Sequence, residues 1–255
     1  MGVKWRKIFG LAVAAAGLGS AILLYGLRPA EAVQIDWTQW RLMEPDGAQY
    51  DEGKRLSSRR SPYFYRTDDD WLGFADIATG TTSRHSKHPR SELRELNGQG
   101  KRACWMPEGQ HTLTCCLRVR QADSRNVVIG QVYNMTDGIP LITLGYTPEN
   151  KLGGNLRVLY ETERGHGHST PLAVPIALGE PFLYQLREED GELQVRINGE
   201  VVYEHEVTVP DKVFYFKCGN YDQSAVAGEM SDKVLSRVEF QSIAVAHPEG
   251  SVMGR

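Results

Sequence analysis

The clearest alternation of polar and apolar side chains runs along residues 214–223. One face carries Tyr215, Lys217, Gly219, Tyr221 and Gln223, and the other carries Phe214, Phe216 and Cys218. Because successive side chains of a β-strand point to opposite faces, this spacing predicts a strand. Two tyrosines, a lysine and a glutamine around a glycine are an unusual surface for a purely structural strand. We therefore predict that this strand forms the floor of a groove.

Two further segments predict strands with a polar face over an apolar one. In residues 90–94, the face opposite Leu93 carries Arg90, Glu92 and Arg94. In residues 127–133, one face carries Gln131 and Tyr133, and the other carries Val128 and Val132. Three alternating charges on one strand face are costly unless they pair across strands or meet a ligand, and the sequence leaves both interpretations open.

The rest of the chain after residue 33 reads as short strands separated by turns. Asn198 with Gly199 and Asp190 with Gly191 are strong signals for hairpin turns, and residues 237–242 alternate as a final strand. No window after residue 33 shows an apolar period of helical length. These features predict an all-β fold, a β-sandwich jelly roll of two antiparallel sheets with a concave groove. The glycine-rich segments 145–155 and 161–170 are predicted to be rim loops that act as lids.

The first 32 residues differ in composition from the rest. Lys4, Arg6 and Lys7 precede an uncharged run of 20 residues at 8–27, and an Ala-Glu-Ala sequence ends at Ala32. This order is typical of a secretory signal peptide, and the run also matches the ~20 residues of a membrane-spanning helix. We expect residues 1–32 to be a signal peptide or an N-terminal membrane anchor, and residues 33–255 to be one domain. Either alternative exports the domain, so we expect it in the periplasm, secreted, or anchored to the inner membrane.

The charge balance limits the partners of this domain. The whole chain has a net charge of -3, and loss of residues 1–32 removes four basic residues and one acidic residue, which leaves -6. An acidic domain lacks the broad basic field that nucleic-acid binding needs. A polyanion would have to meet a local cluster of cations, for which Arg90, Arg94 and Lys217 are the candidates.

Four cysteines follow the N-terminal segment, namely Cys104, Cys115, Cys116 and Cys218. Adjacent cysteines point to opposite faces of a strand, so we expect one disulfide, from Cys104 to either Cys115 or Cys116. Cys218 falls on the apolar face and is expected to be a buried thiol. No Cys-x-x-Cys pair and no histidine spacing indicates a metal, and we expect neither a metal nor a cofactor.

Together, the three polar strands resemble polysaccharide lyase family 7, the alginate lyases with a jelly-roll fold. The family pattern is an Arg-x-Glu-x-Arg strand, a Gln-Ile/Val-His strand and a Tyr-Phe-Lys-x-Gly-x-Tyr-x-Gln strand, which match residues 90–94, 131–133 and 215–223. The resemblance covers nearly all of residues 33–255, and it departs from the pattern where Tyr133 replaces the histidine. It implies a lyase that cleaves a 4-linked polyuronate, with alginate as the expected substrate.

The resemblance also implies roles for the side chains. Arg90 and Gln131 would bind and neutralise the uronate carboxylate, and Tyr221 would serve as acid and base. Tyr133 stands where the family has a catalytic histidine, and Tyr215 is a candidate wall of the groove. The residues that would shape the sugar subsites are Glu92, Arg94, Lys217 and Gln223.

β-Elimination suits these residue types. It removes the proton from carbon 5 and expels the oxygen on carbon 4, through an enolate that donors on the carboxylate stabilise. A tyrosine, with an ordinary pKa of ~10, is a base only where cations lower that value, and Arg94 and Lys217 are expected to supply the field. In β-mannuronate the proton and the leaving oxygen are syn, so Tyr221 alone can serve both, whereas guluronate needs a second base. Because Tyr133 replaces the histidine, we expect a preference for mannuronate.

Other interpretations stay open at this point. The substrate is alternatively another polyuronate such as β-glucuronan, or the protein binds carbohydrate without catalysis, because aromatic platforms suffice for binding. His166 and His168 lie in a predicted loop and are candidates to replace the missing imidazole, whereas His85, His88 and His111 are expected at the surface or in the core. Residues 188–192 show a Glu-x-Asp-x-Glu spacing found in some retaining glycoside hydrolases. We expect a monomer that binds an acidic polysaccharide.

Overall fold

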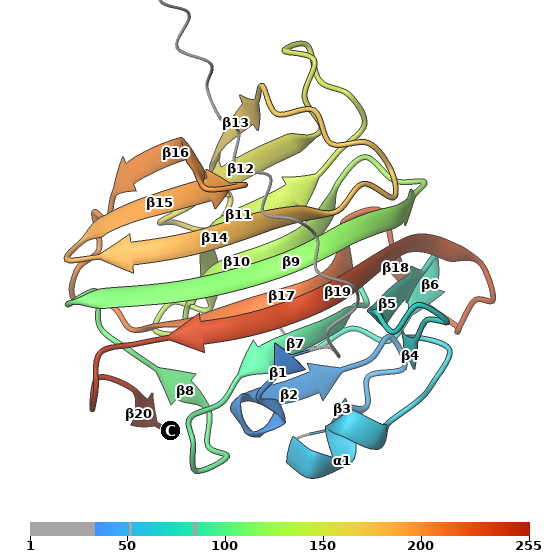
Figure 1. Cartoon of the computed structure of the whole chain (residues 1–255), viewed down its shortest axis with the longest axis horizontal. Helices are drawn as coiled ribbons and strands as arrows, with labels where there is room; N and C mark the ends of the chain where they lie inside the picture. The colour runs from blue at the N-terminus through green and yellow to red at the C-terminus, as the bar shows by residue number, and fades with distance from the viewer. Residues whose placement is uncertain (1–33, 51–52, 84–85) are drawn as a thin grey trace, which may run out of the picture.

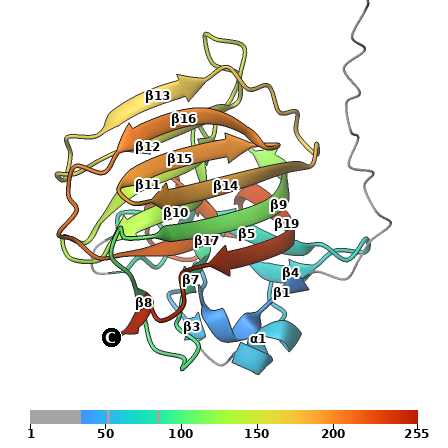
Figure 2. The same ribbon diagram turned by 60° about the vertical axis from the view of Figure 1, so that its left-hand side comes forward.

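The computed structural model describes residues 34–50, 53–83 and 86–255, which form two eight-stranded sheets packed face to face (Figure 1). Figure 2 shows the same two layers from a second direction. The predicted all-β jelly-roll sandwich is confirmed. The predicted signal peptide or anchor, residues 1–32, and His85 lie outside the described residues.

The first sheet has β1 (Gln34–Ile35) alongside β19, and its other strands follow in spatial order: β16 (Glu200–Glu206), β15 (Glu192–Ile197), β14 (Phe182–Glu189), β9 (Gln110–Ala122), β19 (Val234–Ala246), β5 (Leu72–Ile77) and β4 (Phe64–Arg66). The second sheet has, in spatial order, β13 (His168–Leu172), β12 (Leu156–Tyr160), β11 (Ile139–Tyr146), β10 (Val127–Asn134), β17 (Phe214–Asp222), β7 (Ser91–Glu95), β2 (Trp40–Met43) and β3 (Gln49–Tyr50). Two strand pairs lie outside these sheets, β6 (Thr79–Gly80) with β18 (Val226–Ala227) and β8 (Ala103–Cys104) with β20 (Met253–Gly254).

The described helices are short. They are η1 (Trp37–Gln39) and α1 (Gly53–Ser58), three and six residues long. Among the residues that the structure describes, no helix has the length and apolar character needed to cross a membrane. The strand predicted at residues 237–242 is confirmed as the central part of the longer β19, but it is not the final strand, because β20 follows it.

Both predicted hairpins are confirmed. β14 joins β15 at Asp190 and Gly191, and β15 joins β16 at Asn198 and Gly199, where φ is 48°, 88°, 51° and 91° in that order. Asn, Asp and Gly adopt this left-handed backbone at low cost, so the local sequence specifies these turns. The Glu-x-Asp-x-Glu spacing of residues 188–192 is therefore a hairpin in the first sheet, away from the polar strands of the second.

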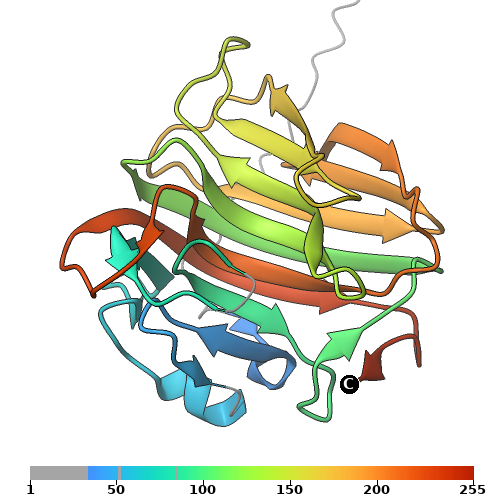
Figure 3. The same ribbon diagram turned by 180° about the vertical axis from the view of Figure 1, so that it is seen from behind.

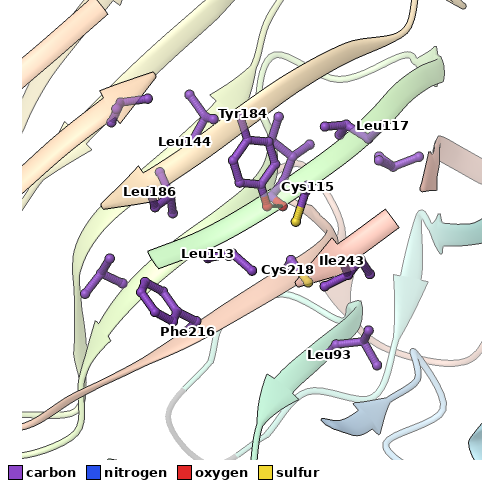
Figure 4. Packing of buried hydrophobic residues seen from close by; sticks show 14 of the residues in the cluster. Leu93, Leu113, Cys115, Leu117, Leu144, Tyr184, Leu186, Phe216, Cys218 and Ile243 are labelled. Carbon is purple, nitrogen blue, oxygen red and sulfur yellow. Dashed lines mark hydrogen bonds between the residues drawn. The ribbon is translucent and has the colours of Figure 1, made fainter. Parts of the chain in front are cut away.

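Side chains from both sheets fill one core between them (Figure 4). Phe216 and Cys218 of β17 lie in this core, as the alternation predicts. Tyr184 of β14 crosses it, and its hydroxyl donates a hydrogen bond to the carbonyl oxygen of Ile129 in β10 at 2.9 Å. Because a buried hydroxyl without a partner is costly, this bond helps to fix how the two sheets stack. The polar face of β17 is thereby turned away from the core.

The predicted disulfide is wrong, because all four cysteines are free thiols. Cys115 lies in the core, whereas the thiol of Cys116 donates to the side-chain oxygen of Gln241 at 3.3 Å. Cys104 is on β8, which pairs with β20 and not with β9. The separation of β8 from β9 is a property of the tertiary structure that cysteine spacing does not contain. Cys218 is a buried thiol, as predicted.

Candidate active site

Three strands that are distant in the sequence are neighbours in the second sheet. β17 pairs with β10 on one side and with β7 on the other, and Lys217 lies directly opposite both Gln131 and Arg94. Directly opposed residues share a sheet face, so the three predicted polar faces form one surface. Figure 3 views the molecule from the side of this sheet.

Gly219 permits the close approach of β7 to β17. It has a φ of 142° and lies opposite Glu92. A Cβ atom at this position would lie 2.6 Å from the carbonyl oxygen of Ser91 and 2.8 Å from the Cα atom of Glu92. Any side chain here would push the two strands apart, so the glycine is required to keep Glu92 beside Lys217.

A buried carboxylate organises this surface. Glu92 is 3% exposed, and its oxygens contact the ammonium of Lys217, the side-chain amide of Gln131 and, at 3.2 Å, the guanidinium of Arg90. Burial acts to raise the pKa of Glu92, but the charges and hydrogen bonds of Lys217 and Arg90 outweigh it and lower the pKa overall. Glu92 is therefore ionised and holds two cations and an amide in place.

Lys217 is as deeply buried as Arg90. Burial lowers its pKa to about 8, although the carboxylate of Glu92 opposes the shift. Its ammonium nitrogen lies 5.2 Å from the centre of the Tyr133 ring, within the range of a cation–π interaction. Lys217 is thus charged at pH 7 but titrates only slightly above that pH.

Arg90 connects this group to Tyr221. Its guanidinium carbon lies 3.8 Å from the centre of the Tyr221 ring, and one of its nitrogens donates to the hydroxyl of Ser86. The Tyr221 hydroxyl lies 3.1 Å from the same Ser86 oxygen. Arg94 and Lys217 were expected to supply the positive field at Tyr221, but the cation that contacts this ring is Arg90. That correction follows from the path of the chain before β7, which strand alternation does not describe.

Arg94 lies at the other end of the surface. Its guanidinium carbon is 4.0 Å from the centre of the Tyr215 ring, and it forms no ion pair with a described residue. Burial lowers the pKa of Arg94, and the nearby charges of Arg102 and Arg41 add to this shift. Positive charges that crowd one another in this way favour an anionic ligand. This part of the surface therefore answers the question that the sequence left open: Glu92 pairs with its neighbours, and Arg94 remains available to a ligand.

Tyr133 and Tyr215 form an aromatic wall, with ring centroids 5.1 Å apart. The Tyr133 hydroxyl donates to the carbonyl oxygen of Gly138 at 2.7 Å. Burial raises the pKa of Tyr133, although Arg90 opposes the shift, and burial also raises the pKa of Tyr215. A phenol that donates its proton to a carbonyl and resists ionisation is a poor base. The geometry therefore favours Tyr133 as a wall of the site.

These side chains line a pocket of about 310 Å³. Of the residues proposed from the sequence, its lining includes Arg90, Glu92, Arg94, Tyr133, Tyr215 and Lys217. Gln131 is 1% exposed and contacts the lining through Glu92. Tyr221 adjoins the lining through Ser86 and Arg90. Eight of the nine proposed site residues are thus brought into one connected group.

Gln223 is the proposed site residue that lies apart. β17 ends at Asp222, and the backbone N–H of Gln223 donates to the carbonyl of Asn126 at 3.0 Å. Gln223 is not among the residues that line the pocket. Its contact with a sugar stays a prediction.

One face assignment from the sequence is wrong. Val128 lies directly opposite Tyr221, and Gly130 lies opposite Cys218, with an irregularity of the ladder between them. Opposed residues share a face, so Val128 lies on the face of Tyr221 and not on that of Val132. A local bulge of this kind changes which residues share a face, and strict alternation does not reveal it.

The pocket also contains residues that the sequence did not indicate, among them Ser86, Met135, Arg41 and Arg102. Ser86 precedes β7 in a segment without alternation, so no pattern marks it. Arg41 and Met43 alternate with the buried Trp40 and Leu42 in β2, and this alternation is visible in the sequence. The position of Arg41 opposite Arg94 depends on strand pairing.

The loop predicted at residues 161–170 is shorter than expected, because residues 168–170 belong to β13 and pair with β12, and its earlier part reaches the rim of this pocket. Arg164 donates to the carbonyl oxygen of Gly138, a pocket-lining residue, at 2.8 Å. His166 and His168 are exposed and do not line the pocket. Closure of this loop as a lid stays a prediction. Within the described ranges, no three His, Cys, Asp or Glu residues are grouped to hold a metal ion.

Comparisons with known proteins agree with this geometry. A model of the alginate lyase family matches residues 35–247, and a search of curated protein sequences finds no significant match. Among solved structures, an alginate lyase from Pseudomonas aeruginosa is 28% identical with a TM-score of 0.73, over 84% of this chain and 100% of that chain. Alginate lyase A1-II′, a member of polysaccharide lyase family 7, is 25% identical with a TM-score of 0.68. The match covers 84% of this chain and 96% of that chain. Since the family model spans most of the sequence and the fold agrees with that of the solved relatives, the chain belongs to the alginate lyase family and is a polysaccharide lyase.

Proposed function

We propose that the protein cleaves alginate at mannuronate by syn β-elimination, with Tyr221 as the single proton carrier. One observation carries this proposal: the Tyr133 hydroxyl is committed to the carbonyl of Gly138, and burial raises its pKa. Tyr221 instead has its ring against Arg90 and its hydroxyl against the Ser86 side chain. A site with one proton carrier suits a substrate whose proton and leaving oxygen lie on the same side.

In the proposed reaction, Arg90 binds the uronate carboxylate. Gln131 assists, because one of its amide hydrogens is bonded to Glu92 and the second is left for a ligand. The phenolate of Tyr221 takes the proton from carbon 5, and the resulting enolate is stabilised by these preorganised donors. The enolate electrons then form the double bond between carbons 4 and 5. The bond from carbon 4 to its glycosidic oxygen breaks, and the phenol returns its proton to that oxygen, which restores the phenolate.

The positive end of the pocket supports an acidic polymer as the substrate. Arg94 and Arg102 both line the pocket, and neither forms an ion pair with a described residue. Further uronates of the same chain would neutralise these charges. In a domain with a net negative charge, a local cluster of cations of this kind directs a polyanion to the pocket.

A substrate panel tests the proposal. Purified protein is mixed with polymannuronate, polyguluronate and β-glucuronan, and the unsaturated uronate product is followed by its ultraviolet absorbance. We expect the highest kcat/KM on polymannuronate. Faster cleavage of polyguluronate would contradict the syn assignment, and faster cleavage of glucuronan would support the alternative substrate. Binding without any product would support the non-catalytic alternative.

The Tyr221→Phe variant tests the proton carrier. It removes only the hydroxyl, so turnover should be lost while binding of polymannuronate persists. Tyr133→Phe is the matched variant in the same pocket, since it also removes one phenolic hydroxyl. Under this proposal, Tyr133→Phe keeps most of the mannuronate activity, and an equal loss in both variants would contradict it.

We also propose that residues 1–32 direct export and that the lyase acts outside the cytoplasm as a monomer. The basic residues before an apolar run support the first part. Fractionation of expressing cells and mass spectrometry of the N-terminus distinguish a cleaved signal peptide, which begins the mature chain at Val33, from a retained anchor. Recovery of the full-length protein in the cytoplasm would contradict export.

A further inference from the structure

The side-chain oxygen of Ser86 is the meeting point of four polar groups beside Tyr221. It lies 3.1 Å from the Tyr221 hydroxyl and 2.8 Å from the carbonyl oxygen of His88. It also accepts from the backbone N–H of His88 at 3.3 Å and from the guanidinium of Arg90. A serine hydroxyl has one hydrogen to donate, so the directions of these bonds can be worked out.

The contacts of Ser86 can be assigned for the state in which Tyr221 is a neutral phenol. A carbonyl oxygen only accepts, so Ser86 donates its one hydrogen to the carbonyl of His88. The two lone pairs of Ser86 then accept from the guanidinium of Arg90 and from the hydroxyl of a neutral Tyr221, which both lie nearer than the backbone N–H of His88. When Tyr221 is a phenolate it has no hydrogen to give, and this arrangement would leave its charge without a donor from Ser86.

Rotation of one hydroxyl resolves this conflict. We propose that Ser86 is the positioning residue that serves both protonation states of Tyr221: it accepts from the phenol and, after its hydrogen swings from the carbonyl of His88, donates to the phenolate. Arg90 holds the Ser86 oxygen in place during this swing, because it bonds to that oxygen and also lies over the Tyr221 ring. The inference rests on the proposed role of Tyr221 as the proton carrier.

His88 keeps this arrangement attached to β17. Its Nδ1 atom lies 2.6 Å from the carbonyl oxygen of Ala225, so Nδ1 carries the hydrogen and donates it. Its ring packs beside the Tyr221 ring at 5.8 Å between centroids. Ala225 follows β17 closely, so His88 ties the segment of Ser86 to the strand end that carries Tyr221. Arg90 and His88 both contact the Tyr221 ring, and Tyr133 is close enough to act on Tyr221 through its charge when it is ionised.

The first test compares Ser86→Ala with Ser86→Thr. Alanine removes the donor to the phenolate, and a hydrogen bond to a charged group is strong, so we expect kcat on polymannuronate to fall about 10- to 100-fold. The ascending limb of the pH–kcat profile should move to higher pH by about one unit, while KM changes by less than about twofold. Threonine keeps a hydroxyl and should restore most of kcat and the original profile. Ser251→Ala, which removes an exposed hydroxyl bonded to the carbonyl of Pro248, is the control with no expected effect.

Two outcomes would overturn the inference. One is a Ser86→Ala enzyme with the wild-type kcat and pH profile. The other is a loss of activity that is equal at every pH and is not rescued by threonine, since that pattern indicates a purely structural role. Thermal melting of each variant shows whether the fold is retained.

A second measurement does not depend on lyase activity and so separates this inference from the proposed function. Tyrosinate formation is followed by ultraviolet difference absorbance in wild type, Ser86→Ala and Tyr221→Phe. The transition that is absent in Tyr221→Phe belongs to Tyr221, and it should move to higher pH in Ser86→Ala. An unchanged transition would refute the role of Ser86 even in a protein that cleaves alginate. A shifted transition in a protein that cleaves no polyuronate would support the hydrogen bond and refute the proposed function.

Discussion

Replacement of Glu92 by glutamine tests whether one buried carboxylate holds the active site together. Arg90 and Lys217 are each 7% exposed, and both contact Glu92. Glutamine keeps the size of the side chain but removes the negative charge, so two cations stay buried without an anion. Removing one member of a buried ion pair costs about 3–5 kcal/mol, and we expect the free energy of unfolding to fall by that amount.

The measurement is urea denaturation at pH 7, followed by tryptophan fluorescence. Lys217 has a pKa of about 8 and is therefore still protonated in the wild-type protein at this pH. Glu189→Gln is the matched control, because Glu189 pairs with Arg187 at the surface. Exposed pairs of this kind contribute about 0–1 kcal/mol, so the control should change stability by no more than that.

A double variant separates the effect of charge from that of shape. Glu92→Gln with Lys217→Met removes both a negative and a positive charge and leaves an apolar side chain of similar length. Because replacing both members of a buried pair is often nearly neutral, the double variant should recover at least half of the stability that Glu92→Gln loses. A loss below about 1 kcal/mol in Glu92→Gln, or no recovery in the double variant, would refute the view that Glu92 serves to neutralise the buried cations.

Three further predictions follow from the geometry of other sites. Gly219→Ala should lower stability and kcat together, because its Cβ would lie 2.8 Å from the Cα atom of Glu92. Thermal melting measures the stability and product absorbance measures kcat, and a stable, fully active variant would contradict this prediction. As pH rises through about 8, Lys217 loses its proton and the pocket loses a positive charge. KM for polymannuronate should therefore rise severalfold between pH 7 and 9.5, and a constant KM would contradict this prediction. Burial raises the pKa of Glu188 to about 7, so its contribution to stability is complete below its ordinary value of 4.5 and is lost as pH rises through about 7. Glu188→Gln should therefore increase the free energy of unfolding at pH 8 by about 1–2 kcal/mol and change it little at pH 4, and denaturation curves at the two pH values check the sign.

The sequence contains most of what defines the fold of this protein. Alternation marks β17, β7 and β10, and the Asn-Gly and Asp-Gly pairs mark the two hairpins, because these signals act within a few neighbouring residues. The order of the three polar strands also identifies the family. These features depend on neighbouring residues or on the order of segments along the chain, so they can be recognised in the sequence alone.

Other features depend on contacts between segments that are far apart in the chain. Glu92 is the centre of the site because β17 carries Lys217 between β7 and β10, and no local pattern specifies that register. Ser86 lies in a segment without alternation, and only the fold brings it to Tyr221, 135 residues away. For the same reason the disulfide prediction failed, since it assumed a proximity that strand pairing does not provide.

The strands, their polar faces, the hairpins and the family thus follow from the sequence, and eight of the nine site residues predicted from it lie in one connected group. Their contacts with one another follow only from the fold. It paired Arg90 with Tyr221, committed the Tyr133 hydroxyl to a carbonyl, and left Arg94 available to a ligand. The physical reason is that a side chain's face follows from backbone geometry within one strand, whereas its partners follow from the register and packing of strands that the chain brings together only when it folds.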